Sequence, residues 1–477
     1  MWSLLLAAAL QTPLDRILTH DDLRGASVGA IVTTLDGTVL YERDSDLRLM
    51  PASNQKLLSV SYALHALGPD FRPQTRIWRL ADRIAIDAPG DPSLSLADLQ
   101  AAAAKVRFSD VTPIAVRQAY RVGVPSTWEH DDLPNRYAPQ IMSFSFDRGA
   151  FQLYAENGKP VLVPESFGVT VRHFPGGVSE REYDPFKKLM IVRGDLPKAR
   201  TFVENFALPE PDKLAAGVFG GVLVPLAELP ASPPTLTITG KSVGEMAKEC
   251  LVPSDNYVAE HLLLMAAGLN EALPNNVYAE ATKRWRGFLV GTAGLDERTL
   301  TLYDGSGMSR HNLVTAASIA KLLRWAQRQP WSNLWMDALV SPGNGTLSSR
   351  LQGSSFRGKT GSLDMVSSLS GYVRTPSGQT LVVSLLMNHF SCPTAQARKI
   401  QDEFIRELEK MSSIGTVIDT SWKYEGALSK PDHRALDGSE SARSGLDRRS
   451  ALQGSHRRVE SPHAPLTRKK RVAVRRR

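Results

Sequence analysis

The sequence predicts an α/β fold of the α+β type, built as one discontinuous domain with a β-rich insertion. Along the chain the patterns follow the order strand pair, helix, β-like stretch, helices, strand pair and helix. The β-like stretch, residues 70–240, is rich in Pro and Gly and has little helical periodicity, unlike the segments on either side of it. The flanking segments are therefore expected to form the two halves of one domain.

The N-terminal residues 1–12 resemble the hydrophobic region of a secretory signal. Trp2–Leu10 is apolar and ends in small residues, with Ala7-x-Ala9 as a possible cleavage site. No Lys or Arg precedes this block, and an ordinary N-terminal helix turn is the alternative interpretation. The pattern predicts an exported protein of the periplasm or cell envelope.

The first half of the domain contains a hairpin and a helix. Residues 27–43 are expected to form the hairpin, because apolar residues alternate along them and Asp36-Gly37 supplies a turn. Residues 54–67 are expected to form a helix, because leucines recur there at mostly helical spacing. Short β-like runs such as Val161–Val163 then mark the inserted region, which we assign to residues 76–240.

Helical periodicity returns after Gly240, in the second half of the domain. The expected helices cover 241–250, 255–269, 276–292, 315–329 and 394–411, and the expected strand pair covers 369–373 and 381–387. The last helix places Ala397, Ile400, Phe404 and Leu408 on one face. Pro393 suits its first turn. Residues 13–75 and 241–414 are therefore assigned to the discontinuous domain.

All of the excess positive charge lies in the C-terminal tail. Residues 421–477 hold 15 Lys and Arg against 6 Asp and Glu, a net of +9, whereas the other 420 residues hold 42 against 43. From Gly415 onward few residues are apolar, so burial cannot offset the entropy lost on ordering. We expect residues 415–477 to form a disordered basic tail that touches polyanionic surfaces. It lacks interleaved aromatics, so specific nucleic-acid binding is not expected.

Several classes of function are excluded by missing motifs. No Gly-x-x-x-x-Gly-Lys-Ser/Thr loop is present to bind a nucleotide phosphate, and none of the ten histidines forms a His-Glu-x-x-His motif. Two cysteines, Cys250 and Cys392, exclude a disulfide-rich scaffold, and whether they pair stays open. No apolar run reaches the roughly 18 residues of a membrane span. We expect neither a metal nor a cofactor.

Three short motifs occur in a fixed order: Ser53-Asn54-Gln55-Lys56, Ser254-Asp255-Asn256 and Lys359-Thr360-Gly361. Each has a plain structural explanation. Ser53 sits where a helix begins and could be its N-cap, any residue of the second motif could cap the next helix, and the third could be a polar turn running into Ser362. In the functional interpretation, the i,i+3 spacing lets the Lys56 amine reach the Ser53 hydroxyl and act as its base.

The three motifs together resemble the serine penicillin-binding proteins and β-lactamases. Ser-x-x-Lys alone is expected by chance about once or more in such a chain, whereas either tripeptide is expected well under once. Ser254 lies 201 positions after Ser53, and this long gap is similar to that of the D-alanyl-D-alanine carboxypeptidase/endopeptidase family. Gly90–Ser95 and Asp304–Arg310 resemble two further stretches of that family. The resemblance covers roughly residues 20–411 and implies a penicillin-binding, β-lactamase-like fold.

One segment departs from the family pattern. Ser143–Arg148 resembles a stretch that usually carries asparagine, here replaced around Asp147-Arg148. This departure is expected to alter the packing of the insertion or the edge of the substrate site.

The resemblance implies a role for each motif residue. Ser53 would attack the carbonyl of the penultimate D-alanine, and Lys56 would take its proton. Ser254 would relay a proton to the leaving amine, while Asn256 would hold Lys56 and the substrate amide. Lys359 would keep the pKa of Lys56 low by like-charge repulsion. Lys359 and Thr360, from the Lys359-Thr360-Gly361 motif, would bind the terminal carboxylate, and the backbone N–H groups of Ser53 and Ser362 would form the oxyanion hole.

The function implied is a serine-type D-alanyl-D-alanine carboxypeptidase, and also an endopeptidase if it cuts cross-links. Its partners would be peptidoglycan stem peptides ending in D-Ala-D-Ala, with β-lactams as inhibitors. Two alternatives stay open. A β-lactamase would share every site residue and differ in the speed of deacylation, and a catalytically idle envelope protein would bind peptidoglycan without cleaving it.

Overall fold

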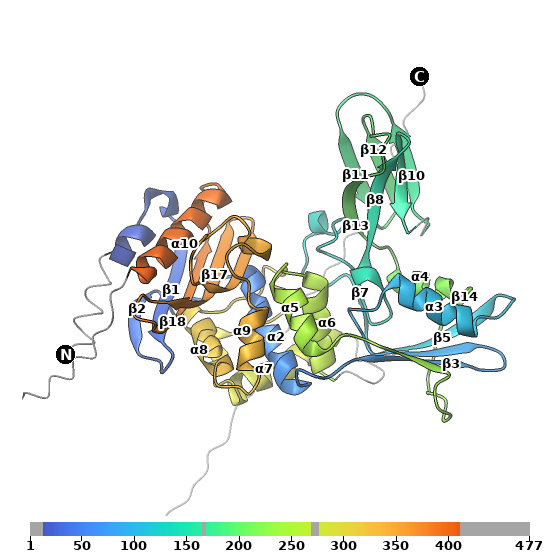
Figure 1. The fold of residues 1–477 in the computed structure, drawn as a ribbon, viewed down its shortest axis with the longest axis horizontal. Helices are drawn as coiled ribbons and strands as arrows, with labels where there is room; N and C mark the ends of the chain where they lie inside the picture. Colours follow the sequence, from blue (N-terminus) through green and yellow to red (C-terminus); the bar gives the residue numbers. More distant parts are fainter. Residues whose placement is uncertain (1–12, 165–167, 269–275, 411–477) are drawn as a thin grey trace, which may run out of the picture. The chain divides into compact units, whose positions relative to one another are not determined.

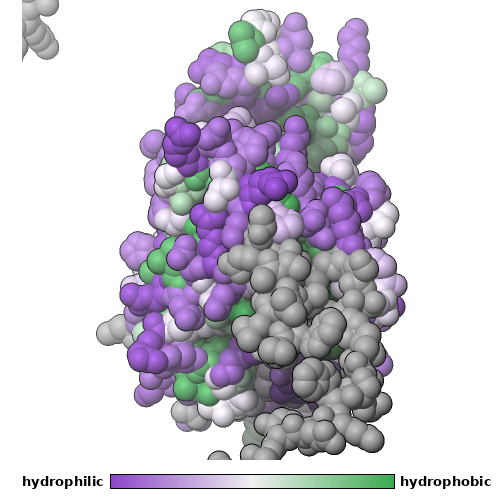
Figure 2. All heavy atoms as spheres, turned by 90° about the vertical axis from the view of Figure 1, so that its left-hand side faces the viewer, coloured by the Kyte–Doolittle hydropathy of each residue, from purple (hydrophilic) through white to green (hydrophobic). Residues whose placement is uncertain are grey.

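The fold is described from a computed structural model over residues 13–164, 168–268 and 276–410 (Figure 1). The predicted signal region 1–12 and the whole of the predicted tail, 415–477, lie outside these residues. None of the helices in the described ranges is both long enough and apolar enough to cross a membrane. On the face seen in Figure 2, hydrophilic side chains predominate outside the grey atoms, and hydrophobic ones form small separate patches.

One antiparallel sheet joins the two ends of the described chain. Its strand order is β16-β17-β18-β1-β2. The strands are β1 (Ser27–Thr34), β2 (Val39–Arg43), β16 (Arg357–Leu363), β17 (Val366–Arg374) and β18 (Thr380–Asn388). The N-terminal hairpin pairs with the C-terminal strands through β1 and β18, which run antiparallel from Ser27↔Asn388 to Thr34↔Leu381. The predicted discontinuous α/β fold is thereby confirmed.

Helices cover both faces of this sheet. The helices on one face are α2 (Gln55–Ala66), α5 (Val243–Leu251), α6 (Asn256–Ala266), α7 (Val277–Gly291), α8 (Ala316–Ala326) and α9 (Ser332–Ala338). Residues 55–64 of α2 are all buried, so this helix runs through the centre of the core. On the other face lies α10 (Thr394–Glu409), whose residues Ala397, Ile400, Phe404 and Leu408 pack on the sheet as expected.

The region between β2 and α5 holds further sheets and two helices. Its main sheet has the order β14-β5-β4-β3-β15, and two three-stranded sheets have the orders β13-β8-β9 and β10-β12-β11. The strands of the main sheet are β3 (Gln74–Arg79), β4 (Ile84–Ala88), β5 (Thr112–Gln118), β14 (Gly221–Pro225) and β15 (Leu236–Thr239). The other strands are β6 (Arg121–Gly123), β7 (Ile141–Met142), β8 (Ala150–Glu156), β9 (Lys159–Val163), β10 (Thr170–Phe174), β11 (Glu180–Asp184), β12 (Leu189–Arg193) and β13 (Thr201–Ala207).

The sequence analysis missed two helices in this region. Helices α3 (Leu96–Val106) and α4 (Pro211–Val218) lie within the stretch that was expected to be mainly β. The signal for α3 was present, because Ser95 and Asp98 form a capping box before an alanine-rich run. The insertion is therefore β-rich but mixed, and its bounds of 76–240 stay a prediction.

Further differences concern predicted local structure. The segment that carries Lys359-Thr360-Gly361 is part of the edge strand β16, not a polar turn, because it pairs with β17 from Arg357↔Tyr372 to Leu363↔Val366. Pro393 is the N-cap of α10 and so lies just before its first turn. Cys250 and Cys392 are both free thiols, which settles the question of their pairing.

Candidate active site

Ser53 lies in a short 3-10 helix, η2 (Ala52–Asn54), directly before α2. The alternative in which Ser53 caps this helix is wrong, because Asn54 holds the N-cap position and α2 begins at Gln55. Ala52 has a φ of +46°. This left-handed conformation costs a residue with a side chain roughly 1–3 kcal/mol. A strained, tight turn therefore presents Ser53, as strained backbone often does at functional sites.

Two glycines let other segments approach this turn closely. A Cβ on Gly361 would lie 3.0 Å from Ser53 N and 2.1 Å from Ser368 Oγ. A Cβ on Gly307 would lie 1.9 Å from Ala52 O. Neither position has room for a side chain. The glycine of the third motif is thus a packing requirement that lets β16 lie against the backbone of the candidate nucleophile.

Lys56 is fully buried one turn after Ser53, and its amine touches three oxygens. Nζ lies 2.8 Å from Ser53 Oγ, 2.6 Å from Asn256 Oδ1 and 2.8 Å from Ser306 O. A neutral amine has two N–H groups and one lone pair. The Asn256 and Ser306 oxygens only accept hydrogen bonds, so they take the N–H groups and leave the lone pair for the Ser53 hydroxyl. The arrangement matches a serine nucleophile with its base.

Burial is the main cause that lowers the pKa of Lys56, and the negative charges of Glu260, Asp304 and Asp255 oppose it. At Lys359, burial and the charge of Lys56 together lower the pKa well below its usual value. The like-charge repulsion expected between the two lysines therefore acts mainly on Lys359. Desolvation, rather than Lys359, is what favours a neutral Lys56.

The second motif lies at the start of α6. Asp255 is the N-cap and accepts a hydrogen bond from Val258 N at 3.1 Å, which decides between the three capping candidates. Asn256 Nδ2 donates to Tyr137 O at 2.7 Å, so Asn256 Oδ1 is held toward Lys56. Ser254 has a φ of +64° and its Oγ accepts from Lys359 Nζ at 2.8 Å. The three motifs thus form two lysine-centred groups.

The segment Asp304–Arg310 supplies the Ser306 carbonyl. Asp304 Oδ1 accepts from Gly307 N at 2.8 Å, and Asp304 Oδ2 accepts from Ser309 N at 2.6 Å. This buried carboxylate folds the segment around itself, so the loop supports the site through the Ser306 carbonyl.

Glu260 of α6 is a functional candidate that sequence reasoning missed. Its Oε1 accepts from Ser306 N at 2.8 Å, and its Oε2 accepts from Gly305 N at 2.9 Å and from Tyr278 Oη at 2.8 Å. Burial, followed by the nearby negative charge of Asp304, raises the pKa of Glu260 above its usual value. The available signal was an acidic residue inside a largely apolar predicted helix. A carboxylate buried in such a helix needs dedicated hydrogen-bond partners.

A pocket of about 300 Å³ opens beside these groups. The predicted residues that line it are Ser53, Ser254, Thr360, Gly361 and Ser362. The lining residues that sequence reasoning missed are Thr346, Arg350 and Arg398. Lys56 and Lys359 reach the pocket through hydrogen bonds to Ser53 and Ser254 on its wall, and Asn256 joins them through its contact with Lys56. All eight predicted site residues are therefore brought together.

The inserted region contacts the same helix end through ion pairs. Arg148 lies 3.0 Å from Asp255 Oδ2 and 2.8 Å from Glu249 Oε2, and Arg136 also lies 3.0 Å from Asp255 Oδ2. Arg148 belongs to the segment that departs from the family pattern. Arg148 therefore ties the insertion to the start of α6, and the altered packing expected from this departure stays a prediction.

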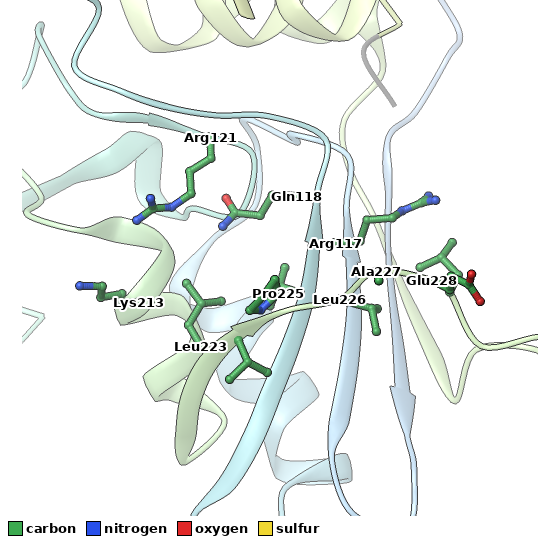
Figure 3. A pocket seen from close by; sticks show the side chains of 12 residues that line it. Arg117, Gln118, Arg121, Lys213, Leu223, Pro225, Leu226, Ala227 and Glu228 are labelled. Atoms are coloured by element: carbon green, nitrogen blue, oxygen red, sulfur yellow. The ribbon is translucent and has the colours of Figure 1, made fainter. Parts of the chain in front are cut away.

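A larger pocket of about 840 Å³ lies elsewhere, along β5 and β14 in the inserted region (Figure 3). No residue of the three motifs lines it. Its arginines are already paired, Arg117 with Asp87 and Arg121 with Asp212. The chemistry is therefore placed in the smaller pocket.

Known proteins share this architecture and sequence. Residues 10–410 match the D-Ala-D-Ala carboxypeptidase 3 (S13) family. The chain is 30% identical to a D-alanyl-D-alanine carboxypeptidase of Actinomadura sp. (strain R39) over 459 residues, covering 82% of this chain and 83% of the relative. It is 23% identical over 455 residues to the D-alanyl-D-alanine carboxypeptidase DacB of Haemophilus influenzae (strain ATCC 51907 / DSM 11121 / KW20 / Rd), covering 82% and 92%.

The fold matches as well. The crystal structure of penicillin binding protein 4 (dacB) from Haemophilus influenzae superposes with a TM-score of 0.70 at 18% identity, covering 83% of this chain and 99% of that one. This likeness confirms the expected penicillin-binding fold. The chain belongs to the D-Ala-D-Ala carboxypeptidase 3 (S13) family of serine peptidases.

Proposed function

We propose that this serine carboxypeptidase releases the terminal D-alanine from peptidoglycan stem peptides through an acyl-enzyme on Ser53. The observation that carries the proposal is the 2.8 Å contact between Ser53 Oγ and a fully buried Lys56 Nζ, whose two N–H groups are engaged by Asn256 and Ser306. A free serine hydroxyl is a weak nucleophile, and an adjacent neutral amine activates it.

In the acylation step, Lys56 takes the Ser53 proton while Ser53 Oγ bonds to the carbonyl carbon of the penultimate D-alanine. The backbone N–H groups of Ser53 and Ser362 stabilise the oxyanion that forms. When the peptide bond breaks, the leaving amine of the terminal D-alanine takes a proton through Ser254, which lies 2.8 Å from Lys359 Nζ. In net terms the proton that Lys56 took from Ser53 is handed to the leaving amine by way of Ser254, so Lys56 is neutral again before water attacks.

In the deacylation step, a water molecule attacks the ester carbonyl, and the neutral Lys56 amine takes a proton from that water. The bond to Ser53 Oγ breaks, Ser53 regains its proton, and the shortened peptide leaves. A penicillin would acylate Ser53 in the same way, with the opened ring left in place. Slow hydrolysis of that ester would make the enzyme penicillin-sensitive.

The test is the intact mass of the protein after incubation with benzylpenicillin, followed by peptide mapping and an assay of D-alanine release. A lasting adduct on Ser53 together with D-alanine release supports the proposal. A brief adduct with destruction of the antibiotic indicates the β-lactamase alternative. A folded protein with neither adduct nor release is the idle binding protein. Dimeric cross-linked stem peptides, assayed in parallel, distinguish carboxypeptidase from endopeptidase preference.

We also propose that the enzyme is exported to the periplasm or cell envelope, because peptidoglycan is assembled outside the cytoplasmic membrane. The apolar block at residues 2–10 supports this location. Fusion of residues 1–12 to a reporter enzyme that is active only after export tests it, and a cytoplasmic reporter contradicts it.

A further inference from the structure

The pocket beside Ser53 contains two arginines that the three motifs do not explain. Arg350 belongs to the loop before β16, and Arg398 belongs to the first turns of α10. We propose that Arg398 is a substrate-binding specificity residue that, with Ser362, holds the free C-terminal carboxylate of the substrate. This inference rests on the proposed function and names a residue that fixes its substrate class.

The two arginines differ in the partners that their guanidinium groups already have. Arg350 lies 2.7 Å from Asp402 Oδ1, and its Nη2 also donates to Gln401 Oε1 at 3.2 Å and to the Arg398 carbonyl at 3.1 Å. Its donors are largely committed to α10. By contrast, Arg398 Nη2 donates to the hydroxyl of Ser362 at 3.0 Å, and none of the described carboxylates lies within 4 Å of its guanidinium. Arg398 therefore keeps free donors at the pocket.

Lys359 is poorly placed to be the main carboxylate anchor. Its Nζ is fully buried and donates to Ser254 Oγ and to Thr360 O, each at 2.8 Å. Burial and the charge of Lys56 lower its pKa well below the usual value, whereas a guanidinium stays protonated at neutral pH. The lasting positive charge at the pocket is thus that of the arginines.

The position of Arg398 suits an anion. Ser362 is the residue directly after the third motif, on the strand that passes Ser53, so a group held by Ser362 and Arg398 lies beside the candidate nucleophile. Arg398 is half-buried, and the neighbouring Arg350 charge lowers its pKa together with burial. An incoming carboxylate relieves this crowding of two cations, and a guanidinium binds carboxylates through two parallel hydrogen bonds.

The test compares two peptides that differ only at the C-terminus: one ends in Lys-D-Ala-D-Ala, and the other carries a terminal carboxamide. The variants of the full chain are Arg398→Gln, Arg398→Lys and, as a matched control, Lys399→Gln. Lys399 is the next residue on α10, is exposed and does not line the pocket, so its variant removes the same charge outside the site.

We expect Arg398→Gln to lower kcat/KM for the acid peptide about 10- to 100-fold, mostly through KM, as for the loss of a charge-assisted hydrogen bond. The carboxamide peptide should change less than about 2-fold, because its neutral end gains little from the guanidinium. Arg398→Lys should restore part of the loss, since it keeps the charge but not the two-pronged geometry. Lys399→Gln should match the unsubstituted enzyme on both peptides.

An equal loss on both peptides would show that Arg398 only supports β16, and an unchanged acid peptide would show that it has no role; either result overturns the inference. The rate of Ser53 acylation by benzylpenicillin and by its methyl ester gives a second readout, in which only the acid should slow. If the unsubstituted enzyme neither cleaves the acid peptide nor forms a penicillin adduct, the proposed function itself fails.

Discussion

The two regions that meet at α6 hold the candidate site by different physical means. On the side of the central sheet, Lys56 and Lys359 are fully buried and are held by short hydrogen bonds to neutral oxygens, with no ion pair to either amine among the described residues. On the side of the insertion, partly exposed Arg136 and Arg148 pair with Asp255. Desolvation favours the neutral lysine amine that the reaction needs. The ion pairs, which weaken with salt, only position α6, the helix that carries Asn256.

A neutral hydrogen bond from the insertion also bears on the buried lysine. The backbone carbonyl of Tyr137, in the insertion, accepts from Asn256 Nδ2 and so orients the side chain that touches Lys56. The insertion therefore reaches the side chain that touches the base through a neutral hydrogen bond, while its ion pairs act one residue away. Damage to the buried groups should be far more costly than damage to the ion pairs, and four predictions test this order.

The largest effect is expected for Ser53→Ala and Lys56→Gln. Each removes one member of the nucleophile and base pair, so kcat/KM for D-alanine release should fall at least about 10⁴-fold. The penicillin adduct should be lost in Ser53→Ala, as measured by intact mass. Far-UV circular dichroism checks that both variants fold. An activity within 10-fold of the parent enzyme would remove Ser53 or Lys56 from the mechanism.

Glu260→Gln should have the next largest effect. The Glu260 carboxylate orders the Gly305 and Ser306 amides, and its charge raises the pKa of Lys56. We expect kcat to fall about 10- to 100-fold because an amide cannot accept from both N–H groups as well. Loss of the negative charge should also lower the pKa of Lys56, which extends the neutral base to lower pH.

The measurement is the pH profile of kcat/KM, whose acidic limb should move to lower pH in Glu260→Gln. Glu280→Gln is the control, because Glu280 pairs with Arg284 on the surface of α7. A drop in rate with an unmoved acidic limb would make Glu260 structural only.

Arg148→Asn should have a small effect. It breaks the ion pair with the partly exposed Glu249 and one of the two ion pairs of the buried Asp255, which keeps Arg136. Arg148 also has a φ of +58°, a conformation that asparagine adopts more readily. The net loss in the free energy of unfolding should be about 1 kcal/mol or less. Thermal unfolding at low and high salt measures it, and the difference from the parent should shrink at high salt. A loss above about 3 kcal/mol would mean that the insertion, not burial, holds the site together.

Deletion of residues 421–477 should have the smallest effect. The deleted residues carry a net charge of +9 but none of the motif residues. D-alanine release should stay within about 2-fold of the parent, while retention on an anionic lipid vesicle should weaken if the tail touches polyanionic surfaces. Loss of peptidase activity would contradict the division of the chain that places the tail outside the catalytic domain.

Local patterns predicted much of this molecule. The hairpin at 27–43, the helix after Ser53, the five helices expected from 241 onward and the face of α10 are all set by periodicity within one segment, whereas the short helix α9 was missed. The errors were local too. Strand β16 was missed because Lys359-Thr360-Gly361 is polar and glycine-rich, and only pairing with β17 makes it a strand.

By itself the sequence determined that Lys56 follows Ser53 by three residues, a spacing that brings side chains together along a helical stretch, and it determined the order and spacing of the three motifs, which identify the family. Only the tertiary structure decided that Glu260 orders Ser306, that Tyr137 orients Asn256 and that Arg398 reaches Ser362. These hydrogen bonds join segments that are far apart in the sequence. They form because buried polar groups must find hydrogen-bond partners among the few that the packing brings near. No local periodicity specifies these partners, because burial and hydrogen-bond satisfaction depend on the packing of the whole fold.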